Sequence, residues 1–222
     1  MKSKTLSDIK TFLVSLLDWI YKKKCYFCHS SKDCLRMCKN CYDSLEFLNY
    51  DKFISVDGIP VYCAGYYEET LQKLIRGLKY HNQRDLAYFQ AKFMWEYWQN
   101  ISNCENYTVI PVPLHKNRQK KRHYNHMELV AQEFCKLSGY GYCPDLIKRV
   151  KDTKPQYKLN HAQRTLNLAG AFEVNENEKI EGKILLIDDI TTTGATFAEM
   201  IKTLKKVGYS DITCFATTTP RI

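Results

Sequence analysis

The chain has 222 residues and carries a net charge of +9 at pH 7. This length suits one domain of ordinary size with a small additional unit, and it is long enough to bury a hydrophobic core. No run of eighteen apolar residues occurs, which argues against a membrane-spanning helix. The positive charge predicts attraction to polyanions without separating nucleic acid, acidic lipid and phosphorylated small molecules. Sixteen tyrosines add aromatic surface, which suits either a protein core or stacking against single-stranded nucleic acid.

Residues 1–24 have the pattern of an amphipathic helix that packs by one apolar face. A signal peptide is disfavoured because Asp18 interrupts the apolar stretch and no small-residue cleavage site follows it. The alternative to packing on the protein body is a peripheral membrane anchor, which Lys22, Lys23 and Lys24 would assist. The predicted apolar face consists of Leu6, Ile9, Leu13, Leu16, Leu17 and Ile20.

Residues 25–50 contain two Cys-x-x-Cys pairs, Cys25 with Cys28 and Cys38 with Cys41. Two such pairs supply the four sulfur ligands of a structural Zn²⁺ site, and so short a segment would depend on the metal to fold. Disulfides are one alternative, although cytosolic thiols stay reduced. An iron site is another, although the glycines usual in iron-binding knuckles are missing. Substitute ligands within the loop are Cys34 and His29, and the cysteines expected to be ordinary thiols are Cys63, Cys104, Cys135, Cys143 and Cys214.

Strand and helix patterns alternate through residues 51–222, which predicts an α/β fold with a parallel sheet and crossover helices. The predicted strands cover residues 61–67, 107–112, 146–150 and 184–187. The predicted helices cover residues 69–80, residues 85–100, a segment that begins at Asn125 with Glu128 completing a capping box, and a segment that follows Gly194 and stops at Gly208.

The most basic segment of the chain, Leu114–His126, follows the predicted strand that ends before Pro113. A solvated charged loop is the plain alternative for such a segment. Because it leaves the carboxyl end of a parallel strand, we expect it on the same sheet edge as Asp188 and Asp189, where open α/β sheets bind ligands. Its lysines and arginines are Lys116, Arg118, Lys120, Lys121 and Arg122.

A second long connection, Lys151–Gly170, shows no clear periodicity. In a compact domain, a connection of this length is more often a lid or a binding loop than filler. We expect it to close over a bound ligand and to exclude water from it.

The most informative segment is Lys183–Phe197, with the sequence KILLIDDITTTGATF. Its apolar run predicts a strand buried on both faces and ended by Asp188 and Asp189. The connection Thr191–Thr196 then lies at a helix N-terminus, where the partial positive charge and the unpaired N–H groups favour a phosphate. Carboxylates suit hydrogen bonds from a sugar diol, so the segment predicts a ribose 5-phosphate ligand. The alternative is that both carboxylates only cap the helix and the threonines form an ordinary turn.

This segment resembles the ribose-phosphate binding motif of the type I phosphoribosyltransferases. The resemblance implies phosphoribosyl pyrophosphate with Mg²⁺ as the ligand, and it places Asp188 and Asp189 on the ribose hydroxyls. The residues that it places around the 5-phosphate are Thr191, Thr192, Thr193, Gly194, Ala195 and Thr196. Basic candidates for the diphosphate are Lys79, Lys116, Arg118, Arg122 and Arg164. No residue is identified as a general base.

A narrower resemblance covers roughly residues 25–217. The four-cysteine segment, GLKY around Lys79, IPVPLHKNRQKKRHYNHMELVAQ, PQYKLNHAQRTLNLAGAF and LLIDDITTTGAT resemble the ComF family of competence-associated proteins, which have a phosphoribosyltransferase-like domain. That family usually has glycine at the position of His123 and glutamine at that of His126. The resemblance implies a role in natural transformation, with single-stranded DNA and the DNA-uptake machinery as partners. It also implies a cytoplasmic location, at the inner face of the cytoplasmic membrane.

Two other functions fit the same sequence features. A metabolic phosphoribosyltransferase would transfer phosphoribose to an unidentified acceptor and release pyrophosphate, with zinc only as a stabiliser. A regulator would sense phosphoribosyl pyrophosphate without turning it over. If the chain handles DNA, Lys120 and Lys121 are the candidates for phosphate contacts, because we expect Arg118 and Arg122 to face the diphosphate.

Overall fold

The computed structural model describes residues 24–31, 36–50, 53–103, 105–153 and 161–221. The predicted N-terminal amphipathic helix lies outside these residues. The chain divides into two compact units, Met1–Leu45 and Glu46–Ile222. Within the described part of the chain, no helix combines the length and the hydropathy needed to cross a membrane.

The first unit contains one described helix, α2 (Lys39–Asp43). The strands of the second unit are β1 (Phe53–Val56), β2 (Ile59–Tyr66), β3 (Tyr107–Pro111), β4 (Gly141–Tyr142), β5 (Ile147–Arg149), β6 (Phe172–Val174), β7 (Lys183–Ile190) and β8 (Ile212–Thr219). Its helices are α3 (Glu69–Tyr80), α4 (Leu86–Trp98), α5 (Lys116–Arg122), α6 (His126–Ser138), α7 (His161–Leu168) and α8 (Ala195–Lys205).

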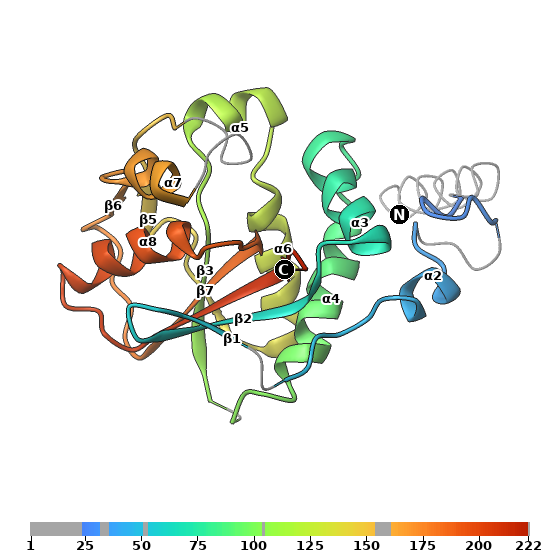
Figure 1. Ribbon diagram of the computed structural model, residues 1–222, viewed down its shortest axis with the longest axis horizontal. Helices are drawn as coiled ribbons and strands as arrows, with labels where there is room; N and C mark the ends of the chain where they lie inside the picture. Colours follow the sequence, from blue (N-terminus) through green and yellow to red (C-terminus); the bar gives the residue numbers. More distant parts are fainter. Residues whose placement is uncertain (1–23, 32–35, 51–52, 104, 154–160, 222) are drawn as a thin grey trace, which may run out of the picture. The chain divides into compact units, whose positions relative to one another are not determined.

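The main sheet has six strands in the order β1-β2-β8-β7-β3-β4 (Figure 1). Only β1 runs antiparallel to its neighbour, β2, and the other neighbouring strands are parallel. The predicted α/β fold with a parallel sheet is therefore confirmed. Strands β5 and β6 pair with each other in a separate antiparallel sheet.

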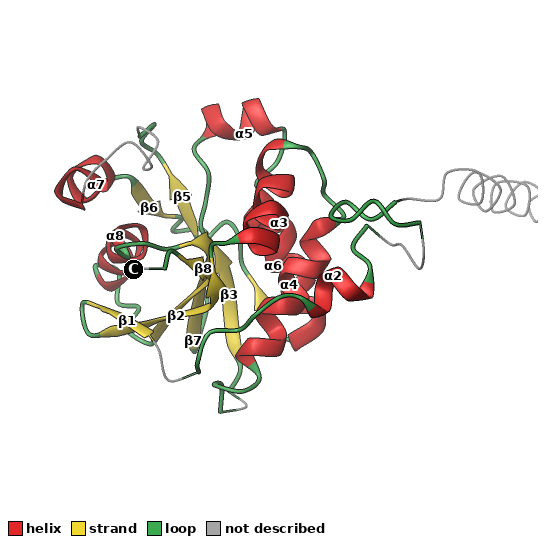
Figure 2. Ribbon diagram, turned by 45° about the vertical axis from the view of Figure 1, so that its right-hand side comes forward, coloured by secondary structure: helices red, strands yellow, loops and turns green. Residues whose placement is uncertain are grey.

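Helices cover both faces of the main sheet, as the views in Figures 1 and 2 show. Helix α4 packs on β2 and β8, and α6 packs on β3 and β7. Helix α8 lies on the opposite side and contacts β6 and α7. Strand β7 lies between two parallel neighbours because its run Ile184–Ile187 is wholly apolar, and all four residues are buried.

Several predicted boundaries agree closely with the structure. The predicted helix 69–80 is α3, and its buried stripe includes Leu71, Leu74 and Leu78. The helix expected from Asn125 is α6, in which the Asn125 side chain accepts a hydrogen bond from the Met127 N–H as an N-cap.

Other boundaries were wrong. The segment Leu114–His126, expected to be a loop, contains the helix α5, which has no buried residue and so gives no periodic signal. The aperiodic connection Lys151–Gly170 contains α7. Strand β7 continues to Ile190 and α8 already begins at Ala195, which leaves Thr191–Gly194 as the connection, and α8 ends before Gly208.

Candidate functional site

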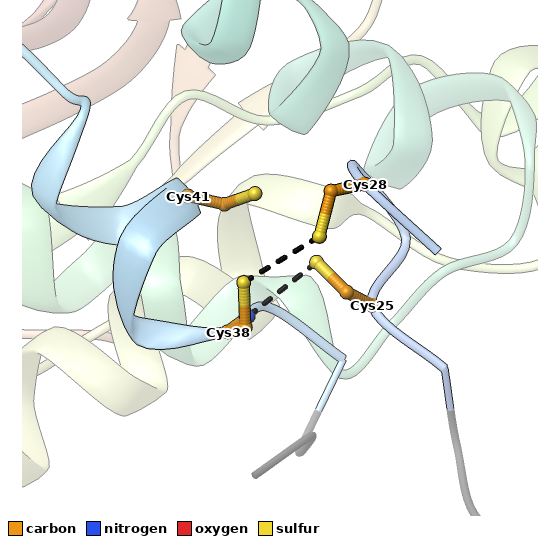
Figure 3. Close-up of side chains that lie close together, drawn as sticks. All are labelled: Cys25, Cys28, Cys38 and Cys41. Carbon is orange, nitrogen blue, oxygen red and sulfur yellow. Dashed lines mark hydrogen bonds between the residues drawn. The ribbon is translucent and has the colours of Figure 1, made fainter. Parts of the chain in front are cut away.

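The four predicted cysteine ligands lie together in the first unit, with their sulfur atoms facing one another (Figure 3). The ligand atoms of Cys25, Cys28, Cys38 and Cys41 all lie within 4.8 Å of one another. The Sγ atoms of Cys28 and Cys38 are 3.6 Å apart. Four Zn–S bonds of about 2.3 Å in tetrahedral arrangement require sulfur separations of about 3.8 Å. The cluster could therefore hold a metal ion of this size.

Backbone contacts hold the two Cys-x-x-Cys turns in place. The Cys38 N–H donates to the Cys25 Sγ over 3.4 Å, and the Tyr26 N–H donates to the Arg36 carbonyl over 2.8 Å. An N–H group directed at a sulfur stabilises the thiolate form that binds a metal. His29 is exposed and is not part of the cluster, and Cys34 lies outside the described residues.

In the second unit, the turn between β7 and α8 depends on a glycine. Gly194 is the N-cap of α8 and has a φ of 72°, a conformation that side chains with a Cβ rarely adopt. A Cβ at this position would also lie 2.4 Å from Cγ2 of Val56 on β1. The turn is therefore packed against the edge of the sheet, and its shape tolerates no larger residue at this position.

The threonines of this turn have different surroundings. The N–H of the buried Thr191 donates to the Thr218 carbonyl of β8 over 2.9 Å, which ties the turn to the sheet. Thr192 and Thr193 are half-buried, and Oγ1 of Thr192 accepts a hydrogen bond from Nη1 of Arg164 over 2.5 Å. The first N–H groups of a helix such as α8 have no intrahelical acceptor. Hydroxyls, N–H groups and a guanidinium thus meet at one helix N-terminus.

The carboxylates that follow the buried run of β7 have unequal environments. Asp189 is buried, and its Oδ2 accepts from the Lys79 ammonium over 2.7 Å and from Nε2 of His126. Asp188 is half-buried, and its Oδ1 accepts from the N–H of Asp189 over 2.8 Å. Asp189 is therefore bound into the fold, whereas Asp188 is the more accessible of the two.

Because of these unequal environments, Asp188 and Asp189 differ in pKa. Burial and the adjacent Asp189 carboxylate raise the pKa of Asp188 to about 7. Burial alone would raise the pKa of Asp189 too, but the Lys79 ammonium and His126 hold it well below its usual range. Burial lowers the pKa of His126 despite the facing Asp189 carboxylate. A neutral His126 that donates from Nε2 leaves Nδ1 as a buried acceptor, and this atom has no hydrogen-bond partner among the described residues.

The basic segment lies at the same sheet edge, as the sequence predicted. Pro111, the last residue of β3, pairs with Ile187, which directly precedes Asp188. His126, at the end of the segment, contacts Asp189. Between them, α5 extends beyond the carboxyl end of β3, at the top of Figure 1.

The five diphosphate candidates do not form one cluster. Lys79 is paired with Asp189, and Arg164 with Thr192. Nη2 of Arg118 donates to the Thr153 carbonyl over 2.7 Å. The two remaining candidates are Arg122, whose guanidinium lies over the ring of Tyr80, and Lys116, which lines an open surface pocket of about 310 Å³ together with Gln119, Lys120 and His123.

Sequence reasoning missed two residues of this region. His126 appeared only as a departure from the family pattern, although the structure places it on Asp189. Arg149 is buried and donates to the Thr153 hydroxyl, and its Nε has no hydrogen-bond partner within the described chain. Burial and the neighbouring Arg118 guanidinium lower the pKa of Arg149 to about 10. Its position within a three-residue strand gave no signal of burial.

No family model matches the chain. Competence protein F of Haemophilus influenzae is 30% identical over 181 residues, which cover 79% of this chain and 75% of that protein. Competence protein ComFC of Streptococcus pneumoniae is 27% identical over 150 residues, or 68% of this chain and 64% of that protein. DNA utilization protein YhgH of Salmonella typhi is 27% identical over 154 residues, or 66% of each chain.

Among solved structures, a crystal structure of adenine phosphoribosyltransferase aligns with 82% of this chain and 88% of its own length, at 12% identity and a TM-score of 0.39. The identity and the coverage of the Haemophilus protein decide the relationship. The chain belongs to the family of competence protein F and ComFC.

Proposed function

We propose that this ComF-family protein binds phosphoribosyl pyrophosphate at the carboxyl end of β7 and acts on single-stranded DNA during DNA uptake. The observation that carries the proposal is the continuity of one segment. Asp188 and Asp189 directly precede Ile190, the last residue of β7, and within five residues of Asp189 the chain turns at Gly194 into the N-terminus of α8. An acceptor for sugar hydroxyls and a phosphate-binding helix N-terminus thus lie next to each other.

In the proposed complex, the ribose hydroxyls donate to Asp188, while Asp189 holds the strand end in place through Lys79 and His126. The 5-phosphate accepts hydrogen bonds from the turn Thr191–Gly194 and the first N–H groups of α8, Ala195 and Thr196 included.

The surrounding arginines would neutralise the negative charge of the diphosphate. Arg118 and Arg149 converge on Thr153, and Arg164 reaches the turn through Thr192. Guanidinium groups suit this role because they bind phosphate oxygens in a bidentate manner. Mg²⁺ bound with the diphosphate would supply further positive charge, and Asp188 is the accessible carboxylate of this edge that suits a hard cation.

Turnover would consist of displacement at the anomeric carbon. A nucleophile would form a bond to that carbon while the carbon–oxygen bond to pyrophosphate breaks, and pyrophosphate would leave with the bonding electrons. The part of the protein would be to orient the ribose through Asp188 and to stabilise the negative charge on the leaving group through the arginines.

The DNA part of the proposal is supported by the charge of +9 and by the relatives, which are named as competence and DNA utilization proteins. In the same way, we propose that the four-cysteine cluster holds a structural Zn²⁺.

Release of pyrophosphate from phosphoribosyl pyrophosphate, measured with and without a single-stranded oligonucleotide, tests the proposal. Binding of both ligands, with release either absent or dependent on DNA, supports it. Steady release without DNA in the presence of a small acceptor would favour the metabolic transferase instead. Failure to bind phosphoribosyl pyrophosphate would overturn the ligand assignment.

A further inference from the structure

Tyr80, the last residue of α3, is an exposed aromatic residue whose ring is flanked by arginines. Its exposed fraction is 60%. The guanidinium carbon of Arg122 lies 5.1 Å from the ring centroid and that of Arg76 lies 5.8 Å from it. By contrast, the exposed Phe47 stacks on the ring of Phe93 within its own unit, with a centroid distance of 4.5 Å. Tyr80 is therefore an exposed ring with one guanidinium nearby from α3 and one from α5.

A second tyrosine–arginine pair adjoins the first. The guanidinium carbon of Arg84 lies 4.5 Å from the ring centroid of Tyr124. The Tyr124 hydroxyl donates to the Leu78 carbonyl, which joins the residues after α5 to the last turn of α3. Tyr80, Tyr124, Arg76, Arg84 and Arg122 are called the tyrosine–arginine surface below.

The charge of this surface is not neutralised by acidic side chains. Among the described residues, Arg76, Arg84 and Arg122 form no ion pair with a carboxylate. The same helix α5 that carries Arg122 also carries the lysines of the open surface pocket, Lys116 and Lys120. An anionic partner at Tyr80 would therefore meet positive charge from both α3 and α5.

We propose that the tyrosine–arginine surface binds single-stranded DNA, with a base stacked on the ring of Tyr80 and the flanking phosphates on the arginines. This inference rests on the DNA part of the proposed function and gives it a location. A chain of unpaired bases and phosphates matches an exposed ring between cations, because any base presents a π-face and each nucleotide carries one negative charge. Duplex DNA would not match it, since its bases are already stacked within the helix.

The surface also has a fixed relation to the proposed ligand site. Lys79 and Tyr80 are neighbours in sequence, and Tyr124 lies two residues before His126. Lys79 and His126 point inward to Asp189, whereas Tyr80 is exposed. The two segments that hold Asp189 thus also carry Tyr80 and Tyr124 of the tyrosine–arginine surface. Substitution of Tyr80 should consequently leave the contacts of Lys79 and His126 with Asp189 intact.

Fluorescence anisotropy with a labelled oligothymidylate, measured across a salt series, tests this proposal. Tyr80→Ala should weaken binding roughly tenfold, because one stacked base is lost, while the slope of affinity against salt stays near that of the wild type. Tyr80→Phe should bind like the wild type. The matched control is Tyr88→Ala, because Tyr88 is an exposed tyrosine of α4 (41%). Among the described residues, its ring makes one aromatic contact, a T-shaped one with Phe89.

A second probe separates stacking from charge. An oligonucleotide of abasic sites keeps the phosphates but removes the bases, so the wild type and Tyr80→Ala should bind it equally. Calorimetry with phosphoribosyl pyrophosphate should give the wild-type affinity for Tyr80→Ala and so report an intact fold. Wild-type binding of oligothymidylate that Tyr80→Ala does not weaken would overturn the stacking surface alone. No binding by the wild type at low salt would overturn the DNA part of the proposed function with it.

Discussion

Lys79 Nζ lies 2.7 Å from Oδ2 of Asp189, at the end of the central strand β7. Their side chains are 15% and 6% exposed, so this ion pair is largely removed from water. The unequal pairing of the two carboxylates at this strand end has a simple consequence: Asp189 is held in the fold by Lys79 and His126, and Asp188 remains to meet a ligand. A double substitution of both aspartates could not separate a loss of stability from a loss of ligand binding.

Removal of the Lys79 charge should destabilise the protein. Lys79→Met leaves the buried Asp189 carboxylate without its cation, and we expect a loss of roughly 3 kcal/mol in the free energy of unfolding. The further substitution Asp189→Asn should recover part of that loss. Urea denaturation followed by circular dichroism measures both effects. Lys92→Met, which breaks the half-exposed pair with Glu96, is the control and should cost less than about 1 kcal/mol. Equal stability of the wild type and Lys79→Met would show that the Lys79–Asp189 ion pair does not stabilise the fold.

Stability should depend on pH through Asp188. Its pKa of about 7 in the folded protein exceeds its ordinary value of 3.8, so the folded state retains a proton that the unfolded state has released. The contribution of Asp188 to stability is therefore complete below about pH 4 and is lost as the pH rises through 7. Asp188→Asn removes this loss, so its stability relative to the wild type should increase between pH 5 and 7.5 and then level off. Urea midpoints at several pH values check this, and a constant difference would show that Asp188 titrates normally.

The four-cysteine cluster should carry about one zinc per chain. Cys25→Ser with Cys28→Ser removes two of the four sulfur ligands and should abolish metal binding, because a tetrahedral site cannot be completed. Cys135→Ser is the control, since this half-buried thiol lies outside the cluster. Elemental analysis of the purified proteins decides the matter. Stoichiometric iron, or a stable protein free of metal, would refute the zinc assignment.

Two exposed lysines of α5 should contribute to DNA affinity by charge alone. Lys120 lines the open surface pocket on α5, and Lys121 is one of several cations near Asp152. Replacement of both by alanine should weaken binding to single-stranded DNA and reduce the salt slope by roughly two, since each neutralised phosphate releases counterions. Affinity for phosphoribosyl pyrophosphate should change little. Fluorescence anisotropy across a salt series measures the slope, and an unchanged slope would place the DNA elsewhere.

The sequence predicted best those elements whose burial follows a regular pattern. The run Ile184–Ile187 and the apolar stripe of α3 both indicated their structures because a single packing face determines each. Helix α5 has no buried residue, so periodicity could not indicate it, and its limits come from the N-cap His115 and the left-handed His123. Strand β8 was not predicted, although it lies in the sheet between β2 and β7, because threonines interrupt its apolar pattern.

The sequence predicted which segments lie at the sheet edge near Asp188, but it did not predict the contacts between their side chains. The ends of parallel strands meet at one sheet edge, which placed the basic segment near Asp188. The pairing of Asp189 with His126, 63 residues away in sequence, depends on how α6 packs against the sheet, and residue spacing carries no record of it. The same holds for Arg149 and Arg118, which meet at Thr153 from different elements.

Calorimetric titration with phosphoribosyl pyrophosphate in the presence of Mg²⁺ tests the central claim most directly, by comparing the wild type with Asp188→Asn. Above about pH 8, where Asp188 with its pKa of about 7 is ionised, the wild type should bind, and Asp188→Asn should bind roughly tenfold or more weakly, because a hydrogen bond to a charged acceptor is lost. The control is Asp211→Asn, an exposed carboxylate that directly precedes β8 and so lies at the amino end of the parallel strands; it should bind like the wild type. No binding by the wild type, or equal affinity in Asp188→Asn, would contradict the proposed ligand site.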